Sequence, residues 1–261
     1  MRSGPCVRSY ILSWSILLLS SVGHNGCVQE SQPPSVERGV AVLMALLQDE
    51  SPDLRRTAAE ALGKIGHRSA LSAVLPLLTD PVPAVRAAAA RALGLMASAT
   101  DGAVIAGLSH SLGDPDDNVR QASALAIGDI EPSPRQLAPV ADLLRSFDVQ
   151  VRQAAVRALL SLDTGQITEW LLPMLDDQDA QVRQIAVAAL GFSGDSRAGS
   201  ALARRLVQDP SPAVRAEAAY HLGKLSGPDP RTALHAAVVK ESDGGVRRWI
   251  EAELKGLHGN D

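Results

Sequence analysis

An arginine preceded by valine or leucine recurs along this chain at a nearly constant interval. The gaps between successive copies are 31, 34, 32, 31, 32 and 32 residues. A regular period of this length is typical of a tandem array, in which no unit can bury its own apolar face without its neighbours. About seven units therefore fill residues 35–258. The seven arginines are Arg55, Arg86, Arg120, Arg152, Arg183, Arg215 and Arg247.

Each unit is predicted to hold two helices, of which the second has the clearer pattern. An apolar residue before the arginine, an alanine three places after it and a leucine seven places after it fall on one face of a helix. Serine or aspartate commonly stands four places before the arginine, where a helix needs an N-cap. Pro76 and Pro173 occupy one column of the first helix, so a kink there is expected to be a feature of the array.

The column pattern D-P-x-P-x-V-R-x-x-A-A-x-A-L-G resembles the HEAT-repeat family, and within it the short HEAT-like subtype named after phycobilisome lyases. The resemblance covers nearly all of the chain after the first thirty residues. It implies an all-α fold, an α-α superhelix (α-solenoid) of about seven two-helix HEAT-like repeats. The second helices would line its concave face.

An acid stands six residues before most of these arginines. A pair that recurs with the structural period is more typical of a frame than of a catalytic site, which is normally used once. The resemblance implies a ladder of hydrogen bonds between adjacent repeats, in which the arginine fork bridges to a neighbouring carboxylate. The residues of this structural ladder are Asp49, Arg55, Asp80, Arg86, Asp114, Arg120, Asp177, Arg183, Asp209 and Arg215.

Positions one and five after each arginine point away from the apolar stripe and vary from unit to unit. Variation on a repeated frame is typical of a binding face, and equally of any solvated face. Arginine and tyrosine are enriched at interface hot spots. The candidate partner-binding residues on the concave face are Arg56, Arg91, Gln121, Gln153, Arg157, Gln184 and Tyr220.

The sequence lacks the common catalytic and cofactor motifs. None of its six histidines precedes a glutamate, which excludes the repeated His-Glu dipeptides that hold two irons in the HEAT-like deoxyhypusine hydroxylase. No CxxC pair, nucleotide-binding glycine loop or hydrolase motif is present. We therefore expect no catalytic residue, no cofactor and no metal. A net charge of −4 argues against a nucleic-acid partner.

The N-terminal segment differs in composition from the rest. Two arginines precede an apolar stretch with a small, polar exit, the pattern of a secretory signal peptide. We interpret residues 1–26 as this signal, 27–34 as a tether and 35–258 as the repeat domain. The stretch HNGC resembles a lipobox, which makes Cys27 a candidate lipidation site. Ordinary cleavage after Gly23 is the alternative.

The resulting hypothesis is a non-catalytic scaffold for protein–protein interaction in the bacterial envelope, either periplasmic or anchored as a lipoprotein, and monomeric. Its partner is a protein, and membrane contact is limited to the lipid anchor. The alternative is a bilin-lyase-like chromophore lyase or isomerase, or an accessory subunit of one. A purely intracellular regulatory solenoid remains open if the N-terminus is not a signal.

Overall fold

A computed structural model describes residues 34–160, 162, 165–224 and 228–256. The predicted signal peptide, Cys27 and all of the tether except Pro34 lie outside the described residues. Within the described part, every regular element is helical. None of these helices is long and apolar enough to cross a membrane.

The helices alternate along the chain as seven pairs, as the repeat period predicts. The second helices are regular and of similar length. They are α2 (Pro52–Ile65), α4 (Pro83–Met96), α6 (Asp117–Ile130), α8 (Val149–Leu160), α10 (Ala180–Phe192), α12 (Pro212–Leu222) and α14 (Gly244–Gly256). The first helices are α1 (Pro34–Leu46), α3 (Leu71–Val74), α5 (Gly102–Ser111), α7 (Ala138–Leu143), α9 (Gly165–Leu171), α11 (Gly199–Gln208) and α13 (Pro228–Lys240).

Short 3₁₀ segments replace parts of several first helices. They span Arg68–Ala70, Leu75–Thr79, Pro134–Leu137, Leu172–Asp176 and Ser196–Ala198. Pro76 and Pro173 lie in the first turn of two of these segments, directly after α3 and α9. A proline has no N–H to continue the α-helical ladder, so the helix tightens where the sequence places it. The kink predicted at this column is therefore a change of helix type.

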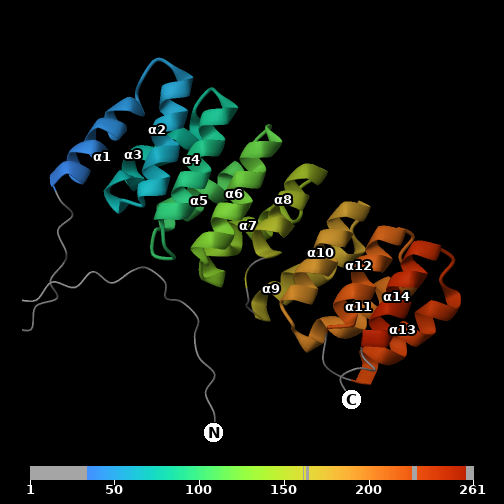
Figure 1. The fold of residues 1–261 in the computed structure, drawn as a ribbon. Coiled ribbons are helices and arrows are strands. Elements are labelled where there is room, and N and C mark those ends of the chain that lie inside the picture. Colours follow the sequence, from blue (N-terminus) through green and yellow to red (C-terminus); the bar gives the residue numbers. More distant parts are fainter. Residues whose placement is uncertain (1–33, 161, 163–164, 225–227, 257–261) are drawn as a thin grey trace, which may run out of the picture. The chain divides into compact units, whose positions relative to one another are not determined.

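The second helices pack against one another in sequence order, α2 on α4, α4 on α6 and so on to α14 (Figure 1). Their leucine and isoleucine column is fully buried, with Leu93 and Ile127 both at 0% exposure. Glycine allows the close approach: a Cβ added at Gly63 would lie 2.7 Å from Ala92 Cα, and one at Gly94 would lie 2.8 Å from Ala126 Cα. Small residues thus set the spacing of this row.

The predicted N-cap column begins helices, although its members do so in two ways. Asp116 and Asp179 each accept hydrogen bonds from two backbone N–H groups of the following turn. Ser51 and Ser211 occupy the cap position without a side-chain bond. In all four of these repeats the acid two residues earlier also accepts the backbone N–H of the cap residue.

The arginine column connects neighbouring repeats through two sets of contacts. In repeat 5, Arg183 Nη1 donates to the carbonyl of Asp177, six residues earlier, at 2.9 Å. Its Nε and Nη2 donate to the two carboxylate oxygens of Asp209 in repeat 6, at 2.8 and 2.9 Å. The same pattern joins four other pairs of repeats in the described chain, through Arg55–Asp80, Arg86–Asp114, Arg152–Asp177 and Arg215–Glu241.

Replacing Arg183 by alanine should destabilise the array. The Asp209 side chain is fully buried, so loss of the guanidinium leaves its carboxylate with the Ser211 N–H and a long contact of 3.7 Å to Arg205. We expect a loss of about 3 kcal/mol in the free energy of unfolding, measured by thermal and urea denaturation. Arg145→Ala, at an 83% exposed side chain, is the matched control and should cost less than about 0.5 kcal/mol. Equal effects of the two variants would contradict this role.

The ladder should also make stability depend on pH in the acid range. Burial raises the pKa of Asp80, Asp114 and Asp209, but hydrogen bonds from the arginines and from backbone N–H groups outweigh it and hold each pKa below its usual value. A lowered pKa in the folded state contributes stability that is complete above about pH 4 and is lost as the pH falls through the folded-state pKa. Melting temperatures should therefore decline below about pH 4. A flat profile down to about pH 2 would exclude a contribution of the ladder.

Candidate functional site

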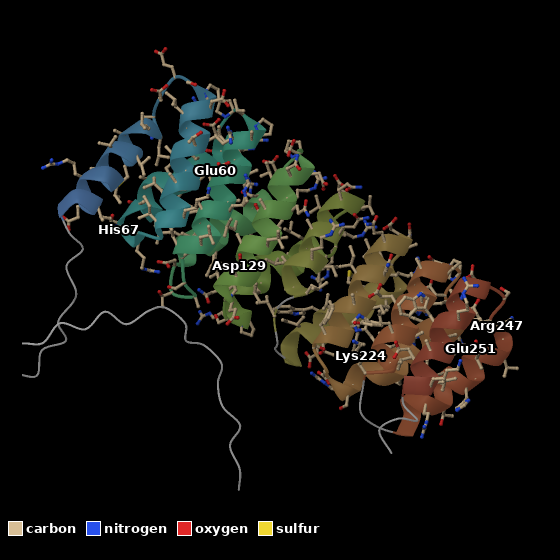
Figure 2. The ribbon with its side chains drawn as sticks, in the orientation of Figure 1. Glu60, His67, Asp129, Lys224, Arg247 and Glu251 are labelled. Carbon is tan, nitrogen blue, oxygen red and sulfur yellow. The ribbon has the colours of Figure 1, made fainter. Side chains whose placement is uncertain are left out.

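The exposed side of the second helices, which we call the second-helix face, carries the candidate partner-binding residues. Near its N-terminal end, Arg56 pairs with Asp53 and Glu60 of its own helix, and Arg91 of α4 reaches Glu60 at 3.8 Å. Figure 2 shows Glu60 on α2. The two arginines therefore share Glu60, and together with Asp53 they form a charge cluster of two cations and two anions.

Two of the candidate glutamines form side-chain hydrogen bonds to the next repeat. Gln153 is 5% exposed and donates to Asp179, the N-cap of α10, at 3.1 Å. Gln184 donates to Glu217 of α12, also at 3.1 Å. Gln121 is exposed and Arg157 is half-buried. Partner binding by these residues stays a prediction. Because Gln153 is buried, its side chain offers little surface to a partner.

Tyr220 belongs to a cluster of aromatic side chains on the second-helix face of repeats 5 to 7. Its ring meets His221 edge-on at a centroid distance of 5.0 Å and Trp249 of α14 at 6.4 Å. Phe192 of α10 meets His221 at 4.8 Å, again edge to face. The full sequence has seven aromatic residues, and three of them gather here. We call Phe192, Tyr220, His221 and Trp249 the aromatic cluster.

Hydrogen bonds to Glu217 hold His221 in place within the aromatic cluster. His221 is 2% exposed, and its Nε2 lies 3.2 Å from Glu217, which in turn accepts the Gln184 amide. The hydrogen bond from His221, and then that from Gln184, lower the pKa of Glu217 against the opposing effect of burial. A carboxylate acceptor fixes the imidazole with its proton on Nε2. His221 is thereby held in one orientation beneath the rings.

The outer surface of the aromatic cluster is open to ligands. Phe192 is 64% exposed and Trp249 is 53% exposed. Lys224, labelled in Figure 2, lies two residues after the end of α12. Its ammonium group donates to the Tyr220 hydroxyl at 2.7 Å and lies 4.1 Å from the centre of the Tyr220 ring. Exposed rings can stack on a planar conjugated molecule, and an ammonium group can pair with a carboxylate. No group of three or more metal-binding side chains is found in the described part of the chain.

The sequence interpretation found Tyr220 but missed its neighbours. These are Phe192, Glu217, Lys224 and Trp249. The signal was present. Phe192 follows its arginine by nine residues, Tyr220 by five and Trp249 by two. Each step of the array moves the aromatic residue back by about one helical turn, which lays the three rings on a diagonal across three packed helices. Comparison within single columns cannot detect a diagonal.

Gly191→Ala should disturb the aromatic cluster specifically. An added Cβ would lie 2.1 Å from His221 Cγ, so the imidazole must move. We expect a loss of about 2 kcal/mol in the free energy of unfolding, with a change in near-UV circular dichroism. Gly39→Ala in α1 is the control, because its added Cβ meets nothing within 4 Å. An unchanged near-UV spectrum in Gly191→Ala would show that His221 is not held as described.

The chain is similar in sequence to one protein family and to two named lyase subunits. The family model described as HEAT repeats matches residues 40–128, 95–160, 137–206 and 168–255. Phycocyanobilin lyase subunit alpha of Picosynechococcus sp. is 32% identical over 199 residues, which cover 66% of this chain and 70% of the relative. The subunit of the same name from Synechocystis sp. is 32% identical over 211 residues, or 70% and 72% of the two chains.

A solved structure shows the fold alone. The Kap95p complex with RanGDP matches with a TM-score of 0.64 at 16% identity, over 84% of this chain and 36% of that one. The two lyase subunits, in contrast, bear on function. The interpretation of this chain as a non-catalytic scaffold, and as no enzyme, is therefore wrong, and the lyase alternative is better supported. The repeated frame dominated the sequence pattern, whereas the aromatic cluster is assembled from three separate repeats.

Proposed function

Because the chain belongs to the HEAT-repeat family and two relatives are named as phycocyanobilin lyase subunits, we propose that it is a subunit of a chromophore lyase. The ligand we assign to it is a linear tetrapyrrole or a similar conjugated molecule with carboxylate groups. The aromatic cluster is the proposed binding region. The observation that carries this proposal is the 32% identity over about two thirds of both relatives.

The chemistry of the aromatic cluster fits such a ligand. Phycocyanobilin is a chain of conjugated pyrrole rings with two propionate groups, so it offers planar faces and negative charges. Phe192, which meets His221, and Trp249, which meets Tyr220, both expose ring surface. Lys224 uses one N–H for the Tyr220 hydroxyl, and an ammonium group has three donors in all. Two remain for a propionate.

His221 and Glu217 act in this proposal as positioning residues. His221 is buried beneath the rings and bonded to Glu217, so it sets the orientation of Tyr220 and Phe192. A rigid platform reduces the ordering cost of ligand binding. The word "subunit" in the names of the relatives supports a second protein as partner. That partner would contact the charge cluster of Arg56 and Arg91 or the remaining second-helix face.

Binding of phycocyanobilin tests the proposal. The purified chain should shift the absorbance of the pigment and induce circular dichroism in its visible band. The double variant Phe192→Ala/Trp249→Ala should weaken binding about thirtyfold, because stacked aromatic contacts contribute on the order of 1 kcal/mol each. Lys224→Met should weaken it further through loss of the propionate contact.

Phe147→Ala removes a fully exposed phenyl group outside the aromatic cluster and serves as the matched control. Melting temperatures verify that all variants fold. If wild type and Phe192→Ala/Trp249→Ala bind the pigment equally, the aromatic cluster is not the binding region. If the wild-type chain gives no spectral change at all, the proposed function itself fails.

A further inference from the structure

The acid column of the ladder has two separate tasks, which its members perform in the same way. In Asp80, Asp114, Asp177, Asp209 and Glu241, one carboxylate oxygen accepts the backbone N–H two residues later and also Nη2 of the preceding repeat's arginine. The other oxygen accepts the arginine Nε, at 2.7 or 2.8 Å. The first oxygen thus closes the turn, and the second completes the bidentate pair.

Repeat 4 has Ser146 where the other repeats have an acid. Its hydroxyl keeps the first task, since the Asp148 N–H donates to Ser146 Oγ at 3.2 Å. A serine has no second oxygen, so the second task is unfilled. Arg120 of repeat 3 faces this position in the register of the ladder. Its Nε is buried and has no hydrogen-bond partner among the described residues.

The rest of Arg120 is held like the other arginines. Nη1 donates to the carbonyls of Asp114 and Pro115, at 2.7 and 3.0 Å. Nη2 has turned to Asp117 of its own helix, at 3.1 Å. Arg120 is only 8% exposed, and a buried N–H without an acceptor destabilises the fold. The guanidinium is therefore preorganised for an acceptor that the chain does not supply.

The turn opposite Arg120 also exposes an apolar side chain. Phe147 follows Ser146 directly, and its exposed fraction of 106% is the largest among the apolar residues described as exposed. The residues at its position in the other turns are Glu50, Pro81, Pro115, Gln178, Pro210 and Ser242. An exposed aromatic ring is one feature of interface hot spots, and an arginine with an unsatisfied N–H is another. The register of the ladder brings Phe147 and Arg120 to the same junction between repeats 3 and 4.

We propose that Arg120 and the turn Ser146–Phe147 form a docking site for a partner protein that presents a carboxylate side chain beside an apolar residue. The carboxylate completes the bidentate pair with Arg120, and the apolar residue covers Phe147. This inference goes beyond the proposed lyase function and does not depend on it, because the aromatic cluster lies in repeats 5 to 7.

The acidic surroundings of Arg120 do not exclude a carboxylate. Arg183 binds Asp209 although Asp177 and Asp179 also act on it. Their counterparts in repeat 3 are Asp114 and Asp116. Asp117, in contrast, stands where repeat 5 has Ala180, so an incoming carboxylate must replace it at Nη2. The column also tolerates acids of different reach, since Glu241 binds Arg215 as closely as the aspartates bind theirs. Arg145, with an 83% exposed side chain, adds a second cation to the turn.

A titration with a short peptide tests the site. The probe is acetyl-Leu-Asp-Leu-amide, and its isosteric control is acetyl-Leu-Asn-Leu-amide. The readout is the ¹⁵N-resolved Nε–Hε resonance of Arg120, assigned with Arg120→Lys. The Asp peptide should shift this resonance with a dissociation constant in the range of about 1 mM. The Asn peptide should bind at least about tenfold more weakly, because it cannot form the charge-assisted pair.

Ser146→Asp supplies the missing carboxylate from within the chain. It should raise the melting temperature by a few degrees, move the Arg120 resonance in the absence of peptide, and abolish peptide binding. Phe147→Ala should weaken peptide binding about threefold. The site is refuted by equal binding of the two peptides, by no shift up to about 10 mM, or by a Ser146→Asp variant that is no more stable and still binds.

Discussion

The whole array depends on an arginine that bonds forward and backward at once. In five of the described repeats, one nitrogen of the guanidinium secures the turn of its own repeat and two others bind the carboxylate of the next, as in Arg183. The carboxylate in turn accepts the N–H that begins the following helix. Because these contacts join adjacent units, the frame tolerates wide variation at exposed positions. Where Ser146 replaces the acid, the arginine of the preceding repeat has no bidentate partner among the described residues.

Function in such an array arises from differences between repeats. The aromatic cluster needs Phe192, Tyr220 and Trp249 on three successive helices, and the close packing of those helices brings their rings within contact of His221 or of each other. Gly191 provides the room for His221. A regular alanine and glycine frame thus supports a locally irregular patch. The likeness to lyase subunits directs attention to this patch as a place for a conjugated ligand.

The sequence predicted much of the fold because a period is a long-range constraint written into local residues. Seven pairs of helices in the described chain and the buried leucine column followed from columns of similar residues. The site was less accessible to sequence reasoning. Tyr220 was singled out as exposed and variable, but its contact with Trp249 depends on how α12 meets α14. The scaffold hypothesis failed because it weighed the frame above its exceptions.

The sequence alone determined the repeat, the helical pairs and the positions of the arginines and acids, since these depend on spacing and on the burial of one apolar stripe. Tertiary structure decided which partner each side chain meets. Asp80 bonds Arg55 of the preceding repeat, whereas its carbonyl bonds Arg86 of its own. It also decided that the buried His221 meets the rings of Phe192 and Tyr220, and that Arg120 Nε lacks an acceptor among the described residues. Contacts between helices depend on their relative rotation and separation, which a period in one chain does not specify.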